Sequence, residues 1–176
     1  MKTLISLIAT LGYISAIACA VFFIIIFIKK ILYYPPNVKE KVYEEIMKLS
    51  YISGLLLVFS STCFYVAKEI VEYDFKRTLR KHTIVSADIE NIFFSKEDMK
   101  GIFDHFENDE GRYRCESFSG IINLDNNESI SVEIIKHCYE KNRYIIVSKQ
   151  YSVESTIGDI NTDKFDYLKS DSINTE

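Results

Sequence analysis

The chain has 176 residues, of which 48% are hydrophobic and 26% are charged, and its formal net charge is −4. The acidic excess lies in the C-terminal half, where residues 88–176 carry nineteen acidic and ten basic side chains. This balance argues against nucleic acid as a ligand, because such binding depends on a basic patch. No internal repeat or low-complexity tract is evident, and the most apolar stretches are two uncharged runs near the N-terminus.

The two uncharged runs, Thr3–Ile28 and Leu49–Ala67, predict a pair of membrane-spanning helices. An apolar run of about 18 or more residues is long enough to cross a bilayer as a helix. Fifteen Leu, Ile, Val and Phe residues in the first run contribute roughly −5 to −9 kcal/mol to insertion, and nine in the second contribute roughly −3 to −5 kcal/mol. The second run also contains several serines, so we expect it to insert together with the first as a helical hairpin.

Small residues predict the faces through which the two helices pack. Gly12, Ala16 and Ala20 recur every four residues and stack on one side of the first helix, where another backbone can approach closely. Gly54 and its neighbouring serine offer a matching face on the second helix. We expect these four small residues to pack the hairpin or, as the alternative, to form a homodimer through the membrane spans.

A cleaved signal peptide is the alternative interpretation of the first run. The segment Ser15–Ala20 is rich in small residues, as a cleavage site would be. The apolar stretch nevertheless continues through Val21–Ile28, and cleavage would leave that stretch without a role. The uncut length fits a membrane span, so we favour an uncleaved anchor.

The charges that flank the first run predict that the C-terminal domain lies outside the cytoplasm. Basic residues near a membrane usually stay cytoplasmic, and the first run has only Lys2 before it but Lys29–Lys30 directly after it. The basic cluster Lys76–Lys81 favours the opposite orientation. Cys115 and Cys138 can form a bridge in an oxidising compartment or stay reduced in the cytosol, and the sequence does not choose between these states.

Beyond the spans, the patterns predict an α+β domain with two helices and a three-strand antiparallel sheet. The Ser95–Asp98 capping box is expected to start a helix whose apolar residues recur at helical spacing up to Phe106. Strands are expected over Arg112–Leu124, around Ile130–Ile134 and from Tyr144 to Val153, with a short helix near Leu168. The expected organisation is a hairpin over residues 1–67, a juxtamembrane helix over 68–82, an α+β domain over 83–168 and a disordered tail over 169–176.

No pattern of residues predicts catalysis, a cofactor or a metal. None of His82, His105 and His137 has the spacing to another histidine or to a cysteine pair that a zinc site needs. The segment Asp159–Asp163 has the alternate oxygen ligands that open a calcium loop, but it lacks the glycine and the final glutamate of such a loop. We interpret this segment as a turn followed by a helix cap, and we expect a non-enzymatic protein.

The remaining candidate function is a surface for a protein partner. Tyrosine and arginine are enriched at protein interfaces, and both cluster along the predicted strands. The alternative interpretation is that amphipathic strands use these residue types in any case. The candidate partner-binding residues are Arg112, Tyr113, Arg114, Tyr139, Arg143, Tyr144 and Tyr151.

The residues with AT-rich codons, such as Ile, Lys and Asn, greatly outnumber Gly, Ala, Arg and Pro, which indicates a gene from a low-GC bacterium or a mobile element such as a prophage. The layout comprises a tiny N-terminal tail (Met1–Lys2), a hairpin (Thr3–Ala67) and a small domain without catalytic residues. In this layout the chain resembles prophage-encoded membrane proteins of the superinfection-exclusion kind, and it is also similar to bacterial immunity proteins that neutralise a toxin. The resemblance implies a protein of the bacterial inner membrane that blocks an incoming phage or toxin protein. A sensor or accessory subunit of an endogenous membrane complex is the alternative.

Overall fold

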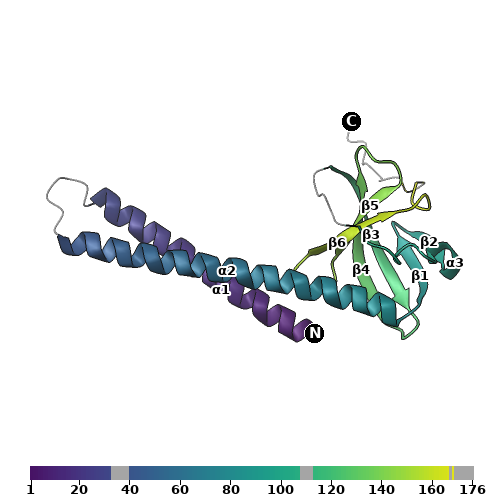
Figure 1. Cartoon of the computed structure of the whole chain (residues 1–176), viewed down its shortest axis with the longest axis horizontal. Coiled ribbons are helices and arrows are strands. Elements are labelled where there is room, and N and C mark those ends of the chain that lie inside the picture. The colour runs from purple at the N-terminus through teal and green to yellow at the C-terminus, as the bar shows by residue number, and fades with distance from the viewer. Residues whose placement is uncertain (33–39, 108–112, 167, 169–176) are drawn as a thin grey trace. The chain divides into compact units, whose positions relative to one another are not determined.

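The computed structural model describes the chain except for residues 33–39, 108–112, 167 and 169–176 (Figure 1). The chain divides into two compact units, Met1–Ala67 and Lys68–Glu176. The described elements are α1 (Lys2–Leu32), α2 (Glu40–Lys81), β1 (Ile84–Ile89), β2 (Ile92–Ser95), α3 (Lys96–Met99), β3 (Arg114–Leu124), β4 (Ser129–His137), β5 (Arg143–Ser148) and β6 (Ser155–Asn161).

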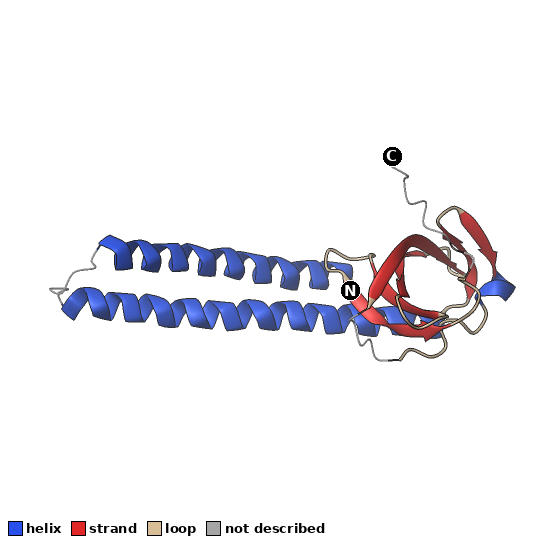
Figure 2. Ribbon diagram, turned by 90° about the horizontal axis from the view of Figure 1, so that it is seen from above, coloured by secondary structure: helices blue, strands red, loops and turns tan. Residues whose placement is uncertain are grey.

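The N-terminal unit consists of α1 and the part of α2 that ends at Ala67, which run side by side (Figure 2). Both helices are long and apolar enough to cross a membrane. At 1.5 Å per residue, the 31 residues of α1 extend about 46 Å, which exceeds a hydrocarbon core of about 30 Å. Large apolar side chains such as Ile17 and Leu57 are more than half exposed, so each helix keeps most of its apolar surface outside the hairpin.

Polar contacts join the two helices along a narrow seam. Hydrogen bonds of this kind between membrane helices favour their association by about 0.6–2 kcal/mol per contact. The buried residues of α1 that form the seam are Ile5, Ala9, Gly12, Ser15 and Cys19. The contacts are Ser15 Oγ to the Leu56 carbonyl at 2.9 Å, Ser60 Oγ to the Gly12 carbonyl at 2.9 Å, and Cys19 Sγ to Ser53 Oγ at 3.3 Å.

The small residues predicted to pack the helices differ in where they lie. Gly12 is buried in the seam and Ala16 is half-buried, whereas Ala20 and Gly54 are exposed. A spacing of four residues turns 400° around the helix, so Ala20 has rotated about 80° away from Gly12. The observed seam instead follows steps of four, three, three and four residues, and their mean of 3.5 keeps it facing the partner helix.

Replacing Gly12 with leucine is expected to weaken the helix pair by about 1–3 kcal/mol. A Cβ at Gly12 would lie 3.2 Å from the Cβ of Cys63 and 3.3 Å from the ring of Phe64, so a larger side chain must push the helices apart. Gly54→Leu is the matched control, because a Cβ at Gly54 meets no atom within 4 Å. Titration of the detergent-solubilised chain with dodecyl sulfate, followed by helix-to-helix energy transfer, measures the difference. Equal effects of the two substitutions would contradict this packing.

The C-terminal unit contains a six-stranded antiparallel sheet in the order β2-β1-β3-β4-β5-β6. Figure 2 shows that the sheet is strongly curled. The segment that follows α3 returns to the far edge of the sheet, where Glu107 and Asp159 exchange two backbone hydrogen bonds of 2.9 and 3.0 Å. Gly158 permits this approach, because its φ is +143° and a Cβ there would lie 2.6 Å from the Glu107 carbonyl oxygen. The segment after α3 therefore helps to close the curled sheet at β6.

The core of this unit follows from alternation along the strands. Phe118, Ile122 and Leu124 of β3 are buried, whereas the residues between them are exposed or half-exposed, except Gly120. Val71 and Phe75, from the C-terminal part of α2, are also buried in this unit. The curled sheet and the C-terminal part of α2 thus bury apolar side chains that would stay exposed on a flat, isolated sheet.

An aromatic cluster lies at the centre of the core. The ring of Phe165 packs edge-on against both Phe94 and Tyr144, with 5.5 Å between ring centroids in each pair. The Tyr144 hydroxyl donates to an Asp166 carboxylate oxygen at 2.9 Å. Burial, together with this hydrogen bond to a carboxylate, raises the pKa of Tyr144 above its ordinary value.

The predicted α+β class is confirmed, but the predicted count of three strands is wrong. β3 and β4 match predicted strands, and β5 matches the third, although it ends at Ser148 instead of Val153. The sequence patterns did not predict β1, β2 or β6. The β1–β2 hairpin turns at Glu90 and Asn91, which both have positive φ, and this pair lacks the glycine that usually marks such a turn.

The helix predicted from Ser95 to Phe106 is present only as the four residues of α3. Its capping box is confirmed, because Ser95 Oγ accepts from the Asp98 N–H and the Asp98 carboxylate accepts from the Ser95 N–H. The chain leaves the helix at Lys100, and Gly101 then adopts a φ of +80°. Close to Leu168, the described residues form turns and no helix.

Candidate partner-binding site beside a disulfide

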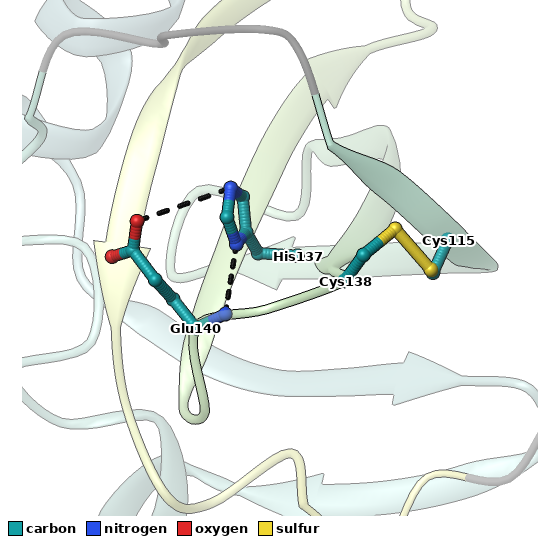
Figure 3. Close-up of a disulfide and its surroundings, with 4 residues drawn as sticks. All are labelled: Cys115, His137, Cys138 and Glu140. Atoms are coloured by element: carbon teal, nitrogen blue, oxygen red, sulfur yellow. Dashed lines mark hydrogen bonds and ion pairs between the residues drawn. A yellow bond between two sulfur atoms is a disulfide. The ribbon is translucent and has the colours of Figure 1, made fainter.

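A disulfide joins β3 to the end of β4. Cys115 lies on β3, Cys138 directly follows β4, and their Cα atoms are 5.2 Å apart (Figure 3). The Cys138 N–H also donates to the Tyr113 carbonyl at 2.9 Å, so the bridge and the backbone hold the same two chain segments together. Both cysteines are exposed, which places the bridge at the surface of the domain.

Two exposed tyrosines flank the disulfide. The Tyr113 ring packs edge-on against Tyr139, with 4.9 Å between centroids, and against His137, with 5.6 Å between centroids. Tyr139 is 79% exposed and Tyr113 is 47% exposed, whereas His137 is buried beneath them. We call Tyr113 and Tyr139 together the tyrosine surface. Such large amphipathic side chains on a fixed base resemble the groups that dominate many protein interfaces.

His137 fixes the turn that carries Tyr139. The Glu140 N–H donates to His137 Nδ1 at 3.0 Å, and the Glu140 carboxylate lies 4.0 Å from Nε2 (Figure 3). Since Nδ1 accepts a hydrogen bond, the proton of the neutral ring belongs on Nε2, which faces that carboxylate. The imidazole therefore links the end of β4 to the turn before β5.

A buried ion pair extends this network into the sheet. Arg143 on β5 and Asp159 on β6 are 8% and 1% exposed, and Arg143 Nε and Nη2 lie 2.7 and 2.6 Å from one Asp159 oxygen. Arg143 Nη1 also donates to both Glu140 carboxylate oxygens at 2.9 Å. Hydrogen bonds to Glu140 and Asp159 raise the pKa of Arg143 above its ordinary value, so the guanidinium stays charged.

Three of the seven predicted partner-binding residues are exposed on the described surface. Tyr113 and Tyr139 form the tyrosine surface, and Arg114 is exposed next to Tyr113 on β3. The Arg114 guanidinium donates to Thr156 Oγ1 at 3.2 Å.

The other predicted residues do not contribute to this surface. Arg143 and Tyr144 are buried in the domain, and Tyr151 is half-buried with its hydroxyl bonded to the Asp74 carboxylate. Arg112 lies outside the described residues. Arg143 and Tyr144 are neighbours on a strand that is buried on both faces, which alternation alone does not reveal.

The network also contains residues that sequence reasoning missed. The predicted turn over Asp159–Asp163 is wrong at its start, because Asp159 to Asn161 complete β6 and Asp159 pairs with Arg143. From the sequence, His137 was considered only as a zinc ligand, whereas the structure places it buried at the end of β4, where it supports the turn. Among the described residues, no group of three His, Cys, Asp or Glu side chains is placed to hold a metal ion.

Comparison of the chain with protein-family models, with curated protein sequences and with solved structures gave no match.

Proposed function

We propose that this chain is a non-enzymatic integral membrane protein whose C-terminal domain binds and blocks an incoming protein, as in phage exclusion or toxin immunity. The observation that carries the proposal is the tyrosine surface, which is exposed and held in place by a disulfide. The two apolar helices anchor the domain to the inner membrane of a bacterial cell.

The disulfide supports an extracytoplasmic position for the domain. Such bridges form and persist in oxidising compartments and are rare in the cytosol. This position agrees with the lysine pair Lys29–Lys30, which favours a cytoplasmic location for the loop between the helices. A domain on the outer side of the inner membrane meets phage or toxin proteins before they reach the cytoplasm.

The support beneath the tyrosine surface suits it to binding. An interface residue contributes most when its own position is fixed before binding, because less conformational entropy is then lost. Tyr113 packs on buried His137, and the turn that bears Tyr139 is held by Glu140 and Arg143. Tyrosine adds a large contact area while ordering only two side-chain torsions.

The first test is membrane topology. Alkaline phosphatase and green fluorescent protein are fused in turn after Leu168, and the full chain is expressed in a bacterial host. The proposal expects phosphatase activity without fluorescence, since the domain lies outside the cytoplasm. Fluorescence without phosphatase activity would place the domain inside and exclude the interception of an entering protein.

Tyr139→Ala is expected to weaken partner binding by about 10–30-fold, because truncating a central interface tyrosine typically costs about 2 kcal/mol. The matched control is Phe93→Ala, since Phe93 is an aromatic residue of similar exposure (71%) on β2. The measurement is survival of cells that express each variant when they are challenged with a panel of phages and membrane-active toxins. Loss of protection with Phe93→Ala but not with Tyr139→Ala would exclude the tyrosine surface.

A sensor or accessory subunit is the second candidate function, and the continuity of α2 favours it. This helix continues without a break from Glu40 to Lys81, and its last part belongs to the C-terminal unit through buried Val71 and Phe75. A ligand that shifts the domain would therefore act directly on a helix that also enters the membrane. Dependence of an endogenous membrane complex on this chain, without protection against phage or toxin, would favour the second candidate.

A further inference from the structure

The last turns of α2 carry a run of cations that is unusual for this acidic domain. Residues 76–81 include Lys76, Arg77, Arg80 and Lys81 and no acid, whereas residues 88–176 have a net charge of −9. Cations in the final turn of a helix interact favourably with the helix dipole, which accounts for Arg80 and Lys81 in part. The dipole does not explain why three of these side chains, Lys76, Arg77 and Arg80, line clefts.

Two neighbouring clefts of about 380 and 430 Å3 share Lys76 and Arg80 in their linings. The first lies along α2 itself. The second is formed where α2 faces the segment after α3, and its lining comprises Lys76, Leu79, Arg80, Phe103, Asp104, His105 and Phe106. An anion in the second cleft would therefore meet an ammonium, a guanidinium and an imidazole from two separate segments of the chain.

Lys76 is held in place before any ligand arrives. Its ammonium lies 2.6 Å from the Glu72 carboxylate and 5.5 Å from the centroid of the Phe106 ring. The Phe106 ring in turn packs against Phe75 and Phe103, with centroid distances of 6.3 and 6.1 Å. The aromatic wall and the ion pair thus position the cation at the edge of the cleft.

Arg80 supplies the cleft with a positive charge that is available to bind an anion. It is exposed and makes no ion pair with any other residue in the described part of the chain. A guanidinium presents several N–H donors in a plane, and this geometry matches two oxygens of a phosphate group. Asp104 is the opposing group in the lining, since its carboxylate repels an anion and weakens the site.

We infer that the cleft between α2 and Phe103–Phe106 binds an anionic phosphate group through Arg80 and Lys76. This inference does not depend on which protein the domain intercepts. The phosphate can come from a soluble phosphate compound or from a lipid headgroup, and only the second source depends on the proposed membrane insertion.

The position of the cleft along α2 bears on the source of the phosphate. Lys76 and Arg80 follow Ala67 by nine and thirteen residues, or about 14 and 20 Å along a helix. The headgroup layer of one leaflet is only about 5–8 Å thick. A helix perpendicular to the bilayer thus carries the cleft beyond the lipid phosphates, and a strongly tilted helix brings it among them.

The test measures amide hydrogen exchange of residues 103–106 in the full chain, reconstituted in nanodiscs. Three conditions are compared: phosphatidylcholine alone, phosphatidylcholine with added inorganic pyrophosphate, and phosphatidylcholine mixed with phosphatidylglycerol, all at equal ionic strength. Slower exchange with pyrophosphate identifies soluble phosphate as the source, and slower exchange only with phosphatidylglycerol identifies the lipid. Either result supports the site if Arg80→Gln raises, by about tenfold, the pyrophosphate concentration or the phosphatidylglycerol content that gives half of the full slowing of exchange.

Lys81→Gln is the matched control, because it removes the same charge from the adjacent position but lines neither cleft. Lys81→Gln should change the half-saturating amount of pyrophosphate or phosphatidylglycerol by less than about twofold. The Lys81 charge would contribute only through screened, long-range attraction. Asp104→Asn should tighten binding, since it removes the repelling carboxylate. Equal effects of Arg80→Gln and Lys81→Gln, or unchanged exchange under all three conditions, would overturn the inference.

Discussion

Replacing Asp159 with asparagine is expected to destabilise the C-terminal domain by about 3–5 kcal/mol, the usual cost of removing one partner of a buried ion pair. The Arg143 guanidinium would remain in an interior where it is only 8% exposed, with its hydrogen bonds to Asp159 weakened. Pulse proteolysis of the detergent-solubilised full chain at increasing urea concentrations measures the loss.

Two variants test whether this loss comes from the buried charge. Glu140→Gln changes the other carboxylate that contacts Arg143, but the Glu140 side chain is 53% exposed, so its loss should cost less than about 1 kcal/mol. The double variant Arg143→Met with Asp159→Leu should recover most of the stability, because an apolar pair of similar volume leaves no unpaired charge. A double variant as unstable as Asp159→Asn would contradict the assignment of the loss to a buried guanidinium that has lost its buried carboxylate partner.

Removing the disulfide by Cys115→Ser is expected to lower the free energy of unfolding by about 3 kcal/mol, which follows from closing a loop across a separation of 23 residues. The bridge restricts the unfolded chain more than it strengthens the folded one, so the folded domain should keep its sheet. Equilibrium unfolding in guanidinium chloride of the full chain in detergent measures the change.

The double variant Cys115→Ser with Cys138→Ser should match the single variant closely, since either substitution already abolishes the bond. A reducing agent should destabilise the unmodified chain by a similar amount and leave both variants unaffected. If dithiothreitol has no effect on the unmodified chain purified from cells, the two thiols were not bridged there, and the extracytoplasmic position loses its main support.

The sequence patterns predicted those parts of the fold in which a local signal and the tertiary structure agree. The two long helices followed from uninterrupted apolar runs, and β3 and β4 lie where strands were expected over Arg112–Leu124 and around Ile130–Ile134. The Ser95–Asp98 capping box was also correct, but the helix after it was not. Met99, Ile102 and Phe103 are all buried as their spacing suggested, although the turn at Gly101 achieves this without a helix.

The missed parts are those in which a long-range partner decides the structure. β6 contains Asp159, an acid that local rules assign to a turn and that becomes acceptable in a strand only when Arg143 arrives from β5. Local sequence patterns also failed to separate exposed from buried residues among the predicted partner-binding residues. Tyr144 and Tyr139 are the same residue type only five positions apart, yet one is fully buried and the other is 79% exposed. Tyr139 lies in the turn between β4 and β5, whereas Tyr144 lies in β5, which is buried along its whole length.

The Glu107–Asp159 bridge at the edge of β6 has a consequence for a protein confined to a surface. Molecules tethered to a bilayer diffuse in two dimensions, so their domains collide far more often than at the same average concentration in solution. An open strand edge invites neighbouring sheets to add to it, and proteins commonly cover such edges or keep them short. Here the outer strand β6 is met by the chain itself at the Glu107–Asp159 bridge, and the other outer strand, β2, offers only four residues. Under the proposed membrane anchoring, copies crowded into one patch of membrane are therefore expected to remain separate, with the tyrosine surface of each left free.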